Sequence, residues 1–240
     1  MQVVTAIYSW DGISFDINGN GDETDIQWNV GILSGNDTIV GGVAADKLAG
    51  FAGNDIIDGG SGIDTATFFS NRSAYTVTKT TTGYTVSGGT DGTDTLTNIE
   101  RLQFSDQTIA LDNSGNAGQV YRLYQTAFNR TPDKGGLGDW IYGMDHGASL
   151  LDVSAGFVNS AEFKSVYGAN PTNTEVVTRF YQNVLHRAPE KAGFDYWMNQ
   201  IDSGVQTRTQ VLTGFSESTE NQAQVIGVIQ NGIEYTQHAV

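Results

Sequence analysis

Hydrophobic and polar positions follow three different patterns along the chain. In residues 32–67 one apolar position recurs every nine residues, between stretches rich in glycine, aspartate and asparagine. In residues 68–111 apolar and polar positions alternate, which is typical of strands. Residues 119–225 contain two long, similar stretches with the spacing of amphipathic helices. These patterns predict an α+β chain of two modules, a β module followed by an all-helical, duplicated one.

The first pattern is a nine-residue repeat. Residues 32–67 divide into ILSGNDTIV, GGVAADKLA, GFAGNDIID and GGSGIDTAT, and the sixth position is aspartate in every unit. The eighth position is Ile39, Leu48, Ile57 or Ala66. This spacing predicts a short strand that turns one apolar side chain inward, followed by a glycine-rich turn that reverses the chain.

The aspartates of the repeat predict a calcium site. If successive turns alternate between two edges of a roll, Asp37 stacks on Asp55 at one edge and Asp46 stacks on Asp64 at the other. Carboxylates and turn carbonyls give an oxygen-only site, which suits Ca²⁺ better than Mg²⁺ or a transition metal. The candidate ligands are the four aspartates and the turns of Gly35, Gly41, Gly50, Gly53, Gly59 and Gly62. The alternative is a flexible Gly/Asp-rich loop, but four consecutive units in register favour the calcium sites.

A second candidate calcium loop lies upstream, in DINGNGDETDIQ, residues 16–27. Its candidate ligands are Asp16, Asn18, Asn20 and Asp22, spaced as in an EF-hand loop. The twelfth position is Gln27, where such a loop needs a bidentate acid. A polar turn between two strands is therefore an equally good interpretation.

Residues 68–111 are expected to form a β cap on the roll. AYTVTKTTTGYTV predicts a hairpin that turns at Thr82 and Gly83, and DTLTNIERLQFSDQTIAL supplies two more strands. Asp91 and Asp94 either ligate another ion or are turn residues, and we favour turn residues.

The helical half is a duplication. RLYQTAFNRTPDKGGLGDW, residues 122–140, aligns without a gap on RFYQNVLHRAPEKAGFDYW, residues 179–197, an offset of 57. After one inserted residue, GFVNSAEF at 156–163 aligns with GFSESTEN at 214–221. We expect Pro132 and Pro189 at the first position of a helix, and Trp140 and Trp197 in the core rather than stacked on a sugar.

Two arginines of the duplication have alternative roles. Arg130 and Arg187 either recognise an anionic sugar or a partner's carboxylate, or pair locally with Asp133, Glu190 or a helix C-terminus. The local pairing is favoured, because both copies keep an acid within the same short motif.

The motifs resemble two known families. The nonapeptides match the GGxGxDxUx repeat of the RTX (hemolysin-type calcium-binding) family, whose fold is a parallel β-roll. The helical repeats, with their R-x-P-x-x-x-G-x-x-x-W signature, resemble a domain of unknown function found in secreted RTX proteins and also phycobilisome linker domains. The RTX resemblance implies export through a type I system of a Gram-negative bacterium and folding on calcium outside the cell.

The charge and the lack of cysteine argue against several kinds of partner and site. The formal net charge is -15, with Lys+Arg 12 against Asp+Glu 27, which disfavours nucleic acid and anionic membrane as partners. Thirteen Asp and two Glu against four Lys and Arg lie in residues 1–118, so this module carries -11 of the charge. Cysteine is absent, which excludes disulfides and thiolate sites.

Catalytic motifs such as H-E-x-x-H and G-x-S-x-G are also missing from the sequence, so we expect no enzyme activity. The expected role is a self-associating structural or adhesive protein of a cell surface, matrix or S-layer. The alternatives are a glycan-binding module or the secretion tail of a larger enzyme.

The expected organisation has five parts. They are a β segment at 1–31, the roll at 32–67, the β cap at 68–111, a linker at 112–118 and the helical domain at 119–240, with repeats at 119–168 and 174–225.

Overall fold

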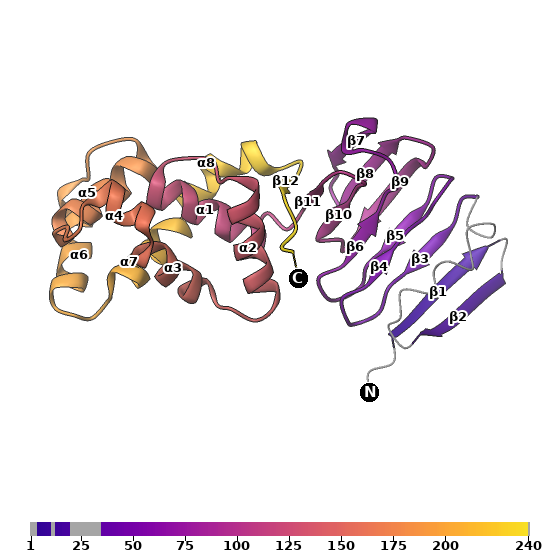
Figure 1. Ribbon diagram of the computed structural model, residues 1–240, viewed down its shortest axis with the longest axis horizontal. Helices are drawn as coiled ribbons and strands as arrows, with labels where there is room; N and C mark the ends of the chain where they lie inside the picture. The colour runs from indigo at the N-terminus through magenta and orange to yellow at the C-terminus, as the bar shows by residue number, and fades with distance from the viewer. Residues whose placement is uncertain (1–3, 11–12, 20–34, 240) are drawn as a thin grey trace. The chain divides into compact units, whose positions relative to one another are not determined.

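The computed structural model describes residues 4–10, 13–19 and 35–239. These residues form eight α-helices and two β-sheets, so the chain is a mixed α and β protein (Figure 1). They divide into two compact units. The first unit comprises residues 1–112 and 230–235, and the second comprises residues 113–229 and 236–240.

The first unit contains two sets of parallel strands that alternate along the chain. In the first sheet, parallel pairing joins β3 (Thr38–Val40), β5 (Ile56–Asp58) and β9 (Gly92–Thr97). In the second sheet it joins β4 (Lys47–Leu48), β6 (Thr65–Thr67) and β10 (Arg101–Gln103). The sheets share no described strand, so they form two layers linked by turns and not a closed roll.

Antiparallel strands extend both sheets. The first sheet continues through the hairpin of β1 (Val4–Trp10) and β2 (Ile13–Gly19) at one end and the hairpin of β7 (Tyr75–Lys79) and β8 (Tyr84–Gly88) at the other. The second continues through β11 (Thr108–Ala110) and β12 (Ile233–Tyr235). Residues 92–103, expected to cap the roll, instead add one more parallel strand to each sheet.

The eighth position of each nonapeptide faces the core. Ile39, Leu48, Ile57 and Ala66 are at most 2 % exposed, because a strand of two or three residues turns only its central side chain inward. Leu96 and Leu102 are in register with Ile57 and Ala66 and are equally buried. The strands of residues 92–103 therefore continue the repeat after an interruption.

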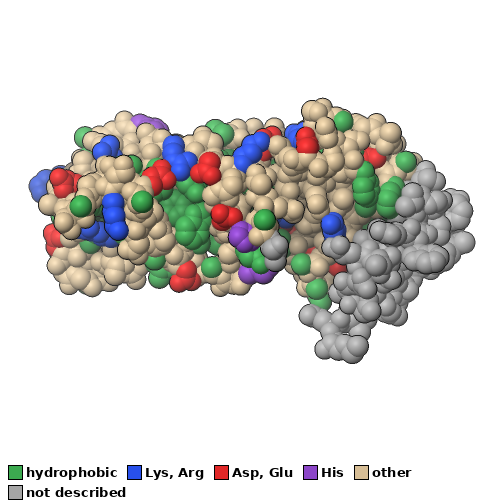
Figure 2. Space-filling model, in the orientation of Figure 1, with side chains coloured by type: hydrophobic (Ala, Val, Ile, Leu, Met, Phe, Trp, Pro, Cys, Tyr) green, Lys and Arg blue, Asp and Glu red, His purple; other side chains and the backbone are tan. Residues whose placement is uncertain are grey.

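The second unit contains all eight α-helices of the described chain. The first repeat forms α1 (Asn116–Phe128), α2 (Lys134–Asp145), α3 (Leu150–Asn159) and α4 (Ala161–Tyr167). The second repeat forms α5 (Asn173–Leu185), α6 (Lys191–Asp202), α7 (Arg208–Ser216) and α8 (Thr219–Ile229). Basic and acidic side chains lie beside one another on the visible face of these helices (Figure 2).

Three expectations for the helical half need correction. The segment 119–240 is not all-helical, because Ile233–Tyr235 form β12 and pair with β11 of the first unit. Helix α1 begins at Asn116, inside the expected linker 112–118. Pro132 and Pro189 each stand one residue before the N-cap, which is Asp133 or Glu190. The Asp133 side chain accepts the backbone N–H of Gly136 at 2.7 Å, so the acid and not the proline begins the helix.

The two tryptophans of the duplication pack on glycines. A Cβ on Gly156 of α3 would lie 2.4 Å from the Trp140 ring, and one on Gly214 of α7 would lie 2.9 Å from the Trp197 ring. Both indoles are half-buried. This contact explains the glycine at this position of each repeat, and it favours the structural interpretation of the tryptophans.

We expect Gly156→Ala to lower the free energy of unfolding of the helical unit by about 1–3 kcal/mol, because the added methyl overpacks the Trp140 contact. Gly227→Ala, at an exposed position of α8 with nothing within 4 Å, is the control and should raise it by about 0.5–1 kcal/mol. Chemical denaturation measures both. Equal effects of the two substitutions would contradict the tryptophan–glycine packing.

Candidate functional site

Acidic side chains stack on one another along two edges of the first unit, three at each edge. At one edge the backbone N–H of Asp37 donates to Asp55 Oδ1 at 2.8 Å, and the N–H of Asp55 donates to Asp94 Oδ1 at 2.9 Å. All three residues are at most 2 % exposed. Each carboxylate therefore fixes the turn of the preceding rung.

The second edge repeats the arrangement. The N–H of Asp46 donates to Asp64 Oδ1 at 2.8 Å, and the N–H of Asp64 donates to Glu100 Oε2 at 2.9 Å. Asp64 is fully buried and Asp46 is 9 % exposed. The expected stacking of Asp37 on Asp55 and of Asp46 on Asp64 is thus present, and each stack has a third acid. We call the six residues the carboxylate ladder.

Two asparagines also link the turns of the first edge, by hydrogen bonds that run in the direction opposite to those of the carboxylates. Asn36 Oδ1 accepts the N–H of Asn54 at 2.8 Å, and Asn54 Oδ1 accepts the N–H of Thr93 at 2.8 Å. Both asparagines stand directly before a ladder aspartate. Neighbouring turns at this edge are therefore joined by amide and carboxylate bonds that run in opposite senses.

The turn glycines stack without room for side chains. A Cβ on Gly53, which has φ +146°, would lie 1.9 Å from the carbonyl oxygen of Gly35. One on Gly62 would lie 2.6 Å from that of Ala44, and one on Gly41 would lie 2.3 Å from that of Gly59. Glycine is thus required where carbonyl oxygens of adjacent turns approach one another.

The first glycine of a turn also leaves space for that turn's own carboxylate. A Cβ on Gly50 would lie 2.1 Å from Asp55 Oδ2, and one on Gly59 would lie 2.7 Å from Asp64 Oδ2. These two oxygens are buried and accept no hydrogen bond from another described residue. An unpaired buried carboxylate oxygen is costly, so each of these positions needs a cation or a proton.

Burial shifts the ladder's titration. Loss of solvation, followed by repulsion from neighbouring acids and opposed by backbone hydrogen bonds, raises the pKa of Asp64 to about 6 and that of Asp94 to about 7. It also raises the pKa of Asp55 and of Glu100. Without a bound cation, Asp64 and Asp94 therefore hold protons at pH values where exposed acids are ionised.

This donor set fits calcium. Ladder carboxylates and the carbonyls of close glycine turns are hard oxygen ligands, which Ca²⁺ takes in numbers of 6–8. Three or more acidic or histidine side chains do not converge on one point in the residues that the structure describes. Asp55, Asp64 and the turns facing them are the residues that would hold the ion.

Two of the four upstream candidates lie in a described strand. Asp16 and Asn18 are in β2, where they pair with Ile7 and Thr5 of β1. Asn20 and Asp22 lie outside the described residues. The structure therefore does not bring Asp16 or Asn18 to the ladder.

Asp91 and Asp94 have different roles. The Asp91 side chain accepts hydrogen bonds from the hydroxyls of Tyr75 and Thr90, as a turn residue does. Asp94, also favoured as a turn residue from sequence, is a rung of the ladder. Its signal was the apolar Leu96 two residues later, which repeats the spacing of Asp55 and Ile57.

The arginines of the duplication make local ion pairs. Arg130 binds Glu162 through two hydrogen bonds of 2.6 and 2.9 Å and lies 3.6 Å from Asp133. Arg187 donates one hydrogen bond to Glu190, the equivalent of Asp133, and its guanidinium lies 3.9 Å from Glu220, the equivalent of Glu162. The equivalent partners in both repeats favour the structural role of these arginines.

We expect the calcium-free first unit to become more stable as the pH falls from 8 to 5.5. The pKa of Asp64 and Asp94 lies above the value of about 4 in an unfolded chain, so the folded state binds more protons in this window. Thermal unfolding of calcium-stripped protein tests this. With saturating calcium the dependence should reverse, because protons compete with the ion. A calcium-free midpoint that falls on acidification would contradict the buried ladder.

Asp94→Asn should stabilise the calcium-free first unit at pH 8 by about 1–3 kcal/mol, because it keeps an acceptor for the Asp55 N–H and removes a buried charge. The stabilisation gained on adding calcium should shrink in the same variant. Asp195→Asn, at an exposed ion pair of α6, is the matched control. The two variants showing the same calcium response would rule out a role for Asp94 in the site.

A known family model matches part of each unit. The RTX calcium-binding nonapeptide repeat (4 copies) matches residues 33–66, which supports calcium binding. No curated protein and no solved structure matches the chain. The domain of unknown function DUF4214 matches residues 104–164 and 154–225. These two stretches together make up more than half of the 240 residues, and the chain therefore belongs to the DUF4214 family.

Proposed function

We propose that the protein is secreted and that its first unit folds when it binds calcium outside the cell. The observation that carries this proposal is the pair of buried carboxylate oxygens, Asp55 Oδ2 and Asp64 Oδ2, which have no hydrogen-bond donor among the described residues. At submicromolar calcium the ladder charges repel one another. At roughly millimolar calcium, binding adds free energy to the folded state.

Calcium-dependent folding of this kind suits a protein that is exported as an unfolded chain. RTX repeats are typical of secreted proteins, and export by a type I system of a Gram-negative bacterium is the route that fits a chain kept open by low cytosolic calcium. None of the helices in the described ranges is long and apolar enough to cross a membrane.

The role that we propose outside the cell is structural or adhesive, in a surface layer, a matrix or a cell-surface attachment, through self-association. Calcium gives the first unit rigidity, and the helical unit supplies a second, separately packed body. We also propose that the protein is not an enzyme. In the described residues, the carboxyl groups with the largest pKa shifts accept hydrogen bonds from turn backbone, which is a structural use.

A sugar site built on the repeated tryptophans and arginines is the alternative, and the contacts do not favour it. The Trp140 ring packs against Gly156, and the Arg130 guanidinium is hydrogen-bonded to the Glu162 carboxylate. A glycan would have to displace both contacts.

A calcium titration followed by circular dichroism and particle sizing tests the proposal. We expect calcium, and not equimolar magnesium, to increase the β signal and the melting temperature, and then to increase particle size. Asp55→Asn with Asp64→Asn should reduce all three responses. An unchanged β signal and melting temperature in excess chelator would overturn calcium-triggered folding. Ordering without any growth in particle size would overturn self-association.

A further inference from the structure

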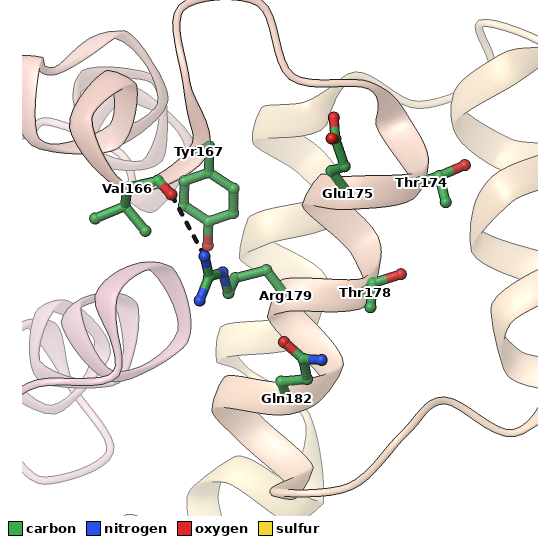
Figure 3. A pocket seen from close by; sticks show the side chains of 7 residues that line it. All are labelled: Val166, Tyr167, Thr174, Glu175, Thr178, Arg179 and Gln182. Atoms are coloured by element: carbon green, nitrogen blue, oxygen red, sulfur yellow. Dashed lines mark hydrogen bonds between the residues drawn. The ribbon is translucent and has the colours of Figure 1, made fainter.

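A polar hollow of about 380 Å³ lies beside α5 in the second repeat (Figure 3). Val166 and Tyr167, at the end of α4, form one wall. The remaining lining residues are on α5 and are Thr174, Glu175, Thr178, Arg179 and Gln182. Arg179 points toward Tyr167, so the hollow has one cationic group beside a fixed aromatic ring.

Arg179 has only weak contacts. One guanidinium nitrogen donates to the Val166 carbonyl at 3.5 Å, and the group lies 5.9 Å from the centre of the Tyr167 ring. No carboxylate of the described residues forms an ion pair with it. Glu175, one turn earlier, points away in Figure 3. Its carboxylate accepts the N–H and hydroxyl of Thr172 at 2.7 and 2.8 Å in the capping box of α5.

The first repeat shows what the same arginine binds. Arg122 stands 57 residues earlier, at the equivalent position of α1. Its Nε and one terminal nitrogen donate to the two carboxylate oxygens of Glu217 at 2.9 and 2.6 Å, and it also donates to the Asn113 carbonyl at 2.7 Å. Arg122 is 3 % exposed. In this fold, the position therefore presents a guanidinium fork suited to one carboxylate.

The hollow is not shaped for another helix. Ala117 and Gly118, which are buried in α1, are replaced at the equivalent positions of α5 by the exposed Thr174 and Glu175. These larger polar side chains give the second repeat a solvated surface at this place. The arginine is retained although the packing surface around it is lost.

We infer that this hollow binds an acidic sugar, a uronate, whose carboxylate pairs with Arg179. The side chains of Thr174, Thr178 and Gln182 are neutral hydrogen-bonding groups that suit sugar hydroxyls. The Tyr167 ring is held in place, because its hydroxyl donates to the Ala127 carbonyl at 2.7 Å. A ligand with a neutral body and one carboxylate matches the single arginine of the lining. An acidic peptide with several carboxylates would be repelled more strongly by the net charge of -15.

Titration of the full chain at constant calcium with methyl glucuronide and methyl galacturonide, each against its neutral glycoside, tests the inference. NMR chemical shifts report binding and its location. We expect saturable binding of at least one uronide, with shifts at Arg179 and Tyr167, and no comparable binding of the neutral glycosides. Arg179→Gln should weaken it by roughly tenfold or more, as expected for a bidentate charge-assisted pair.

Lys191→Gln is the matched control, because it removes one exposed positive charge from α6 and should leave uronide binding unchanged. Binding of neither uronide, equal binding of neutral glycosides, or loss of binding in Lys191→Gln would overturn the inference. Binding of a glutamate-containing peptide in place of the uronides would overturn the sugar as ligand. Circular dichroism of Arg179→Gln confirms that the variant is folded, which its exposed position predicts.

Discussion

The first unit depends on buried carboxylates that stack directly on one another. Four of the six ladder acids, Asp55, Asp64, Asp94 and Glu100, accept the backbone N–H of the acid in the preceding rung. The hydrogen bonds that fix the turns therefore also bring like charges together. The interior strands are only two or three residues long, and each contributes one inward side chain. Where the acids stack, the packing of one side chain per strand does not offset the cost of unpaired buried charge, and a cation or protons must do so.

The helical unit has no such dependence. Its core is built from large apolar and aromatic side chains, among them Phe157, Phe180 and Leu212, which are at most 2 % exposed. Arg122 and Arg130 pair with carboxylates of the same unit, and α3 and α5 begin with capping boxes. On the proposed function, the chain joins a unit whose stability depends on calcium to one whose stability is set by packing. Strand β12 returns the chain to the first unit after the last helix.

Sequence periodicity predicted the strands, the inward positions and the first four acids, because the nine-residue spacing is itself the geometry of one strand and one turn. It missed Asp94 and Glu100 because the β7–β8 hairpin and a shortened turn change the spacing between rungs from 18 residues to 39 and 36. The strand β12 was missed because three residues, Ile233–Tyr235, carry no periodic signal. Its partner lies more than a hundred residues earlier in the chain. The sequence does not distinguish Arg179 from Arg122, because the two arginines are equivalent and differ only in their surroundings.

Amide hydrogen exchange measured by segment, in calcium and in excess chelator, tests the calcium-dependent ladder most directly. The account predicts that chelation removes protection from residues 38–67 and from 92–103 together, since both belong to one ladder, while α1–α8 stay protected. Protection of the ladder strands that is unchanged in chelator would contradict it. So would a loss of protection confined to residues 38–67, because Asp94 and Glu100 would then lie outside the calcium-dependent structure.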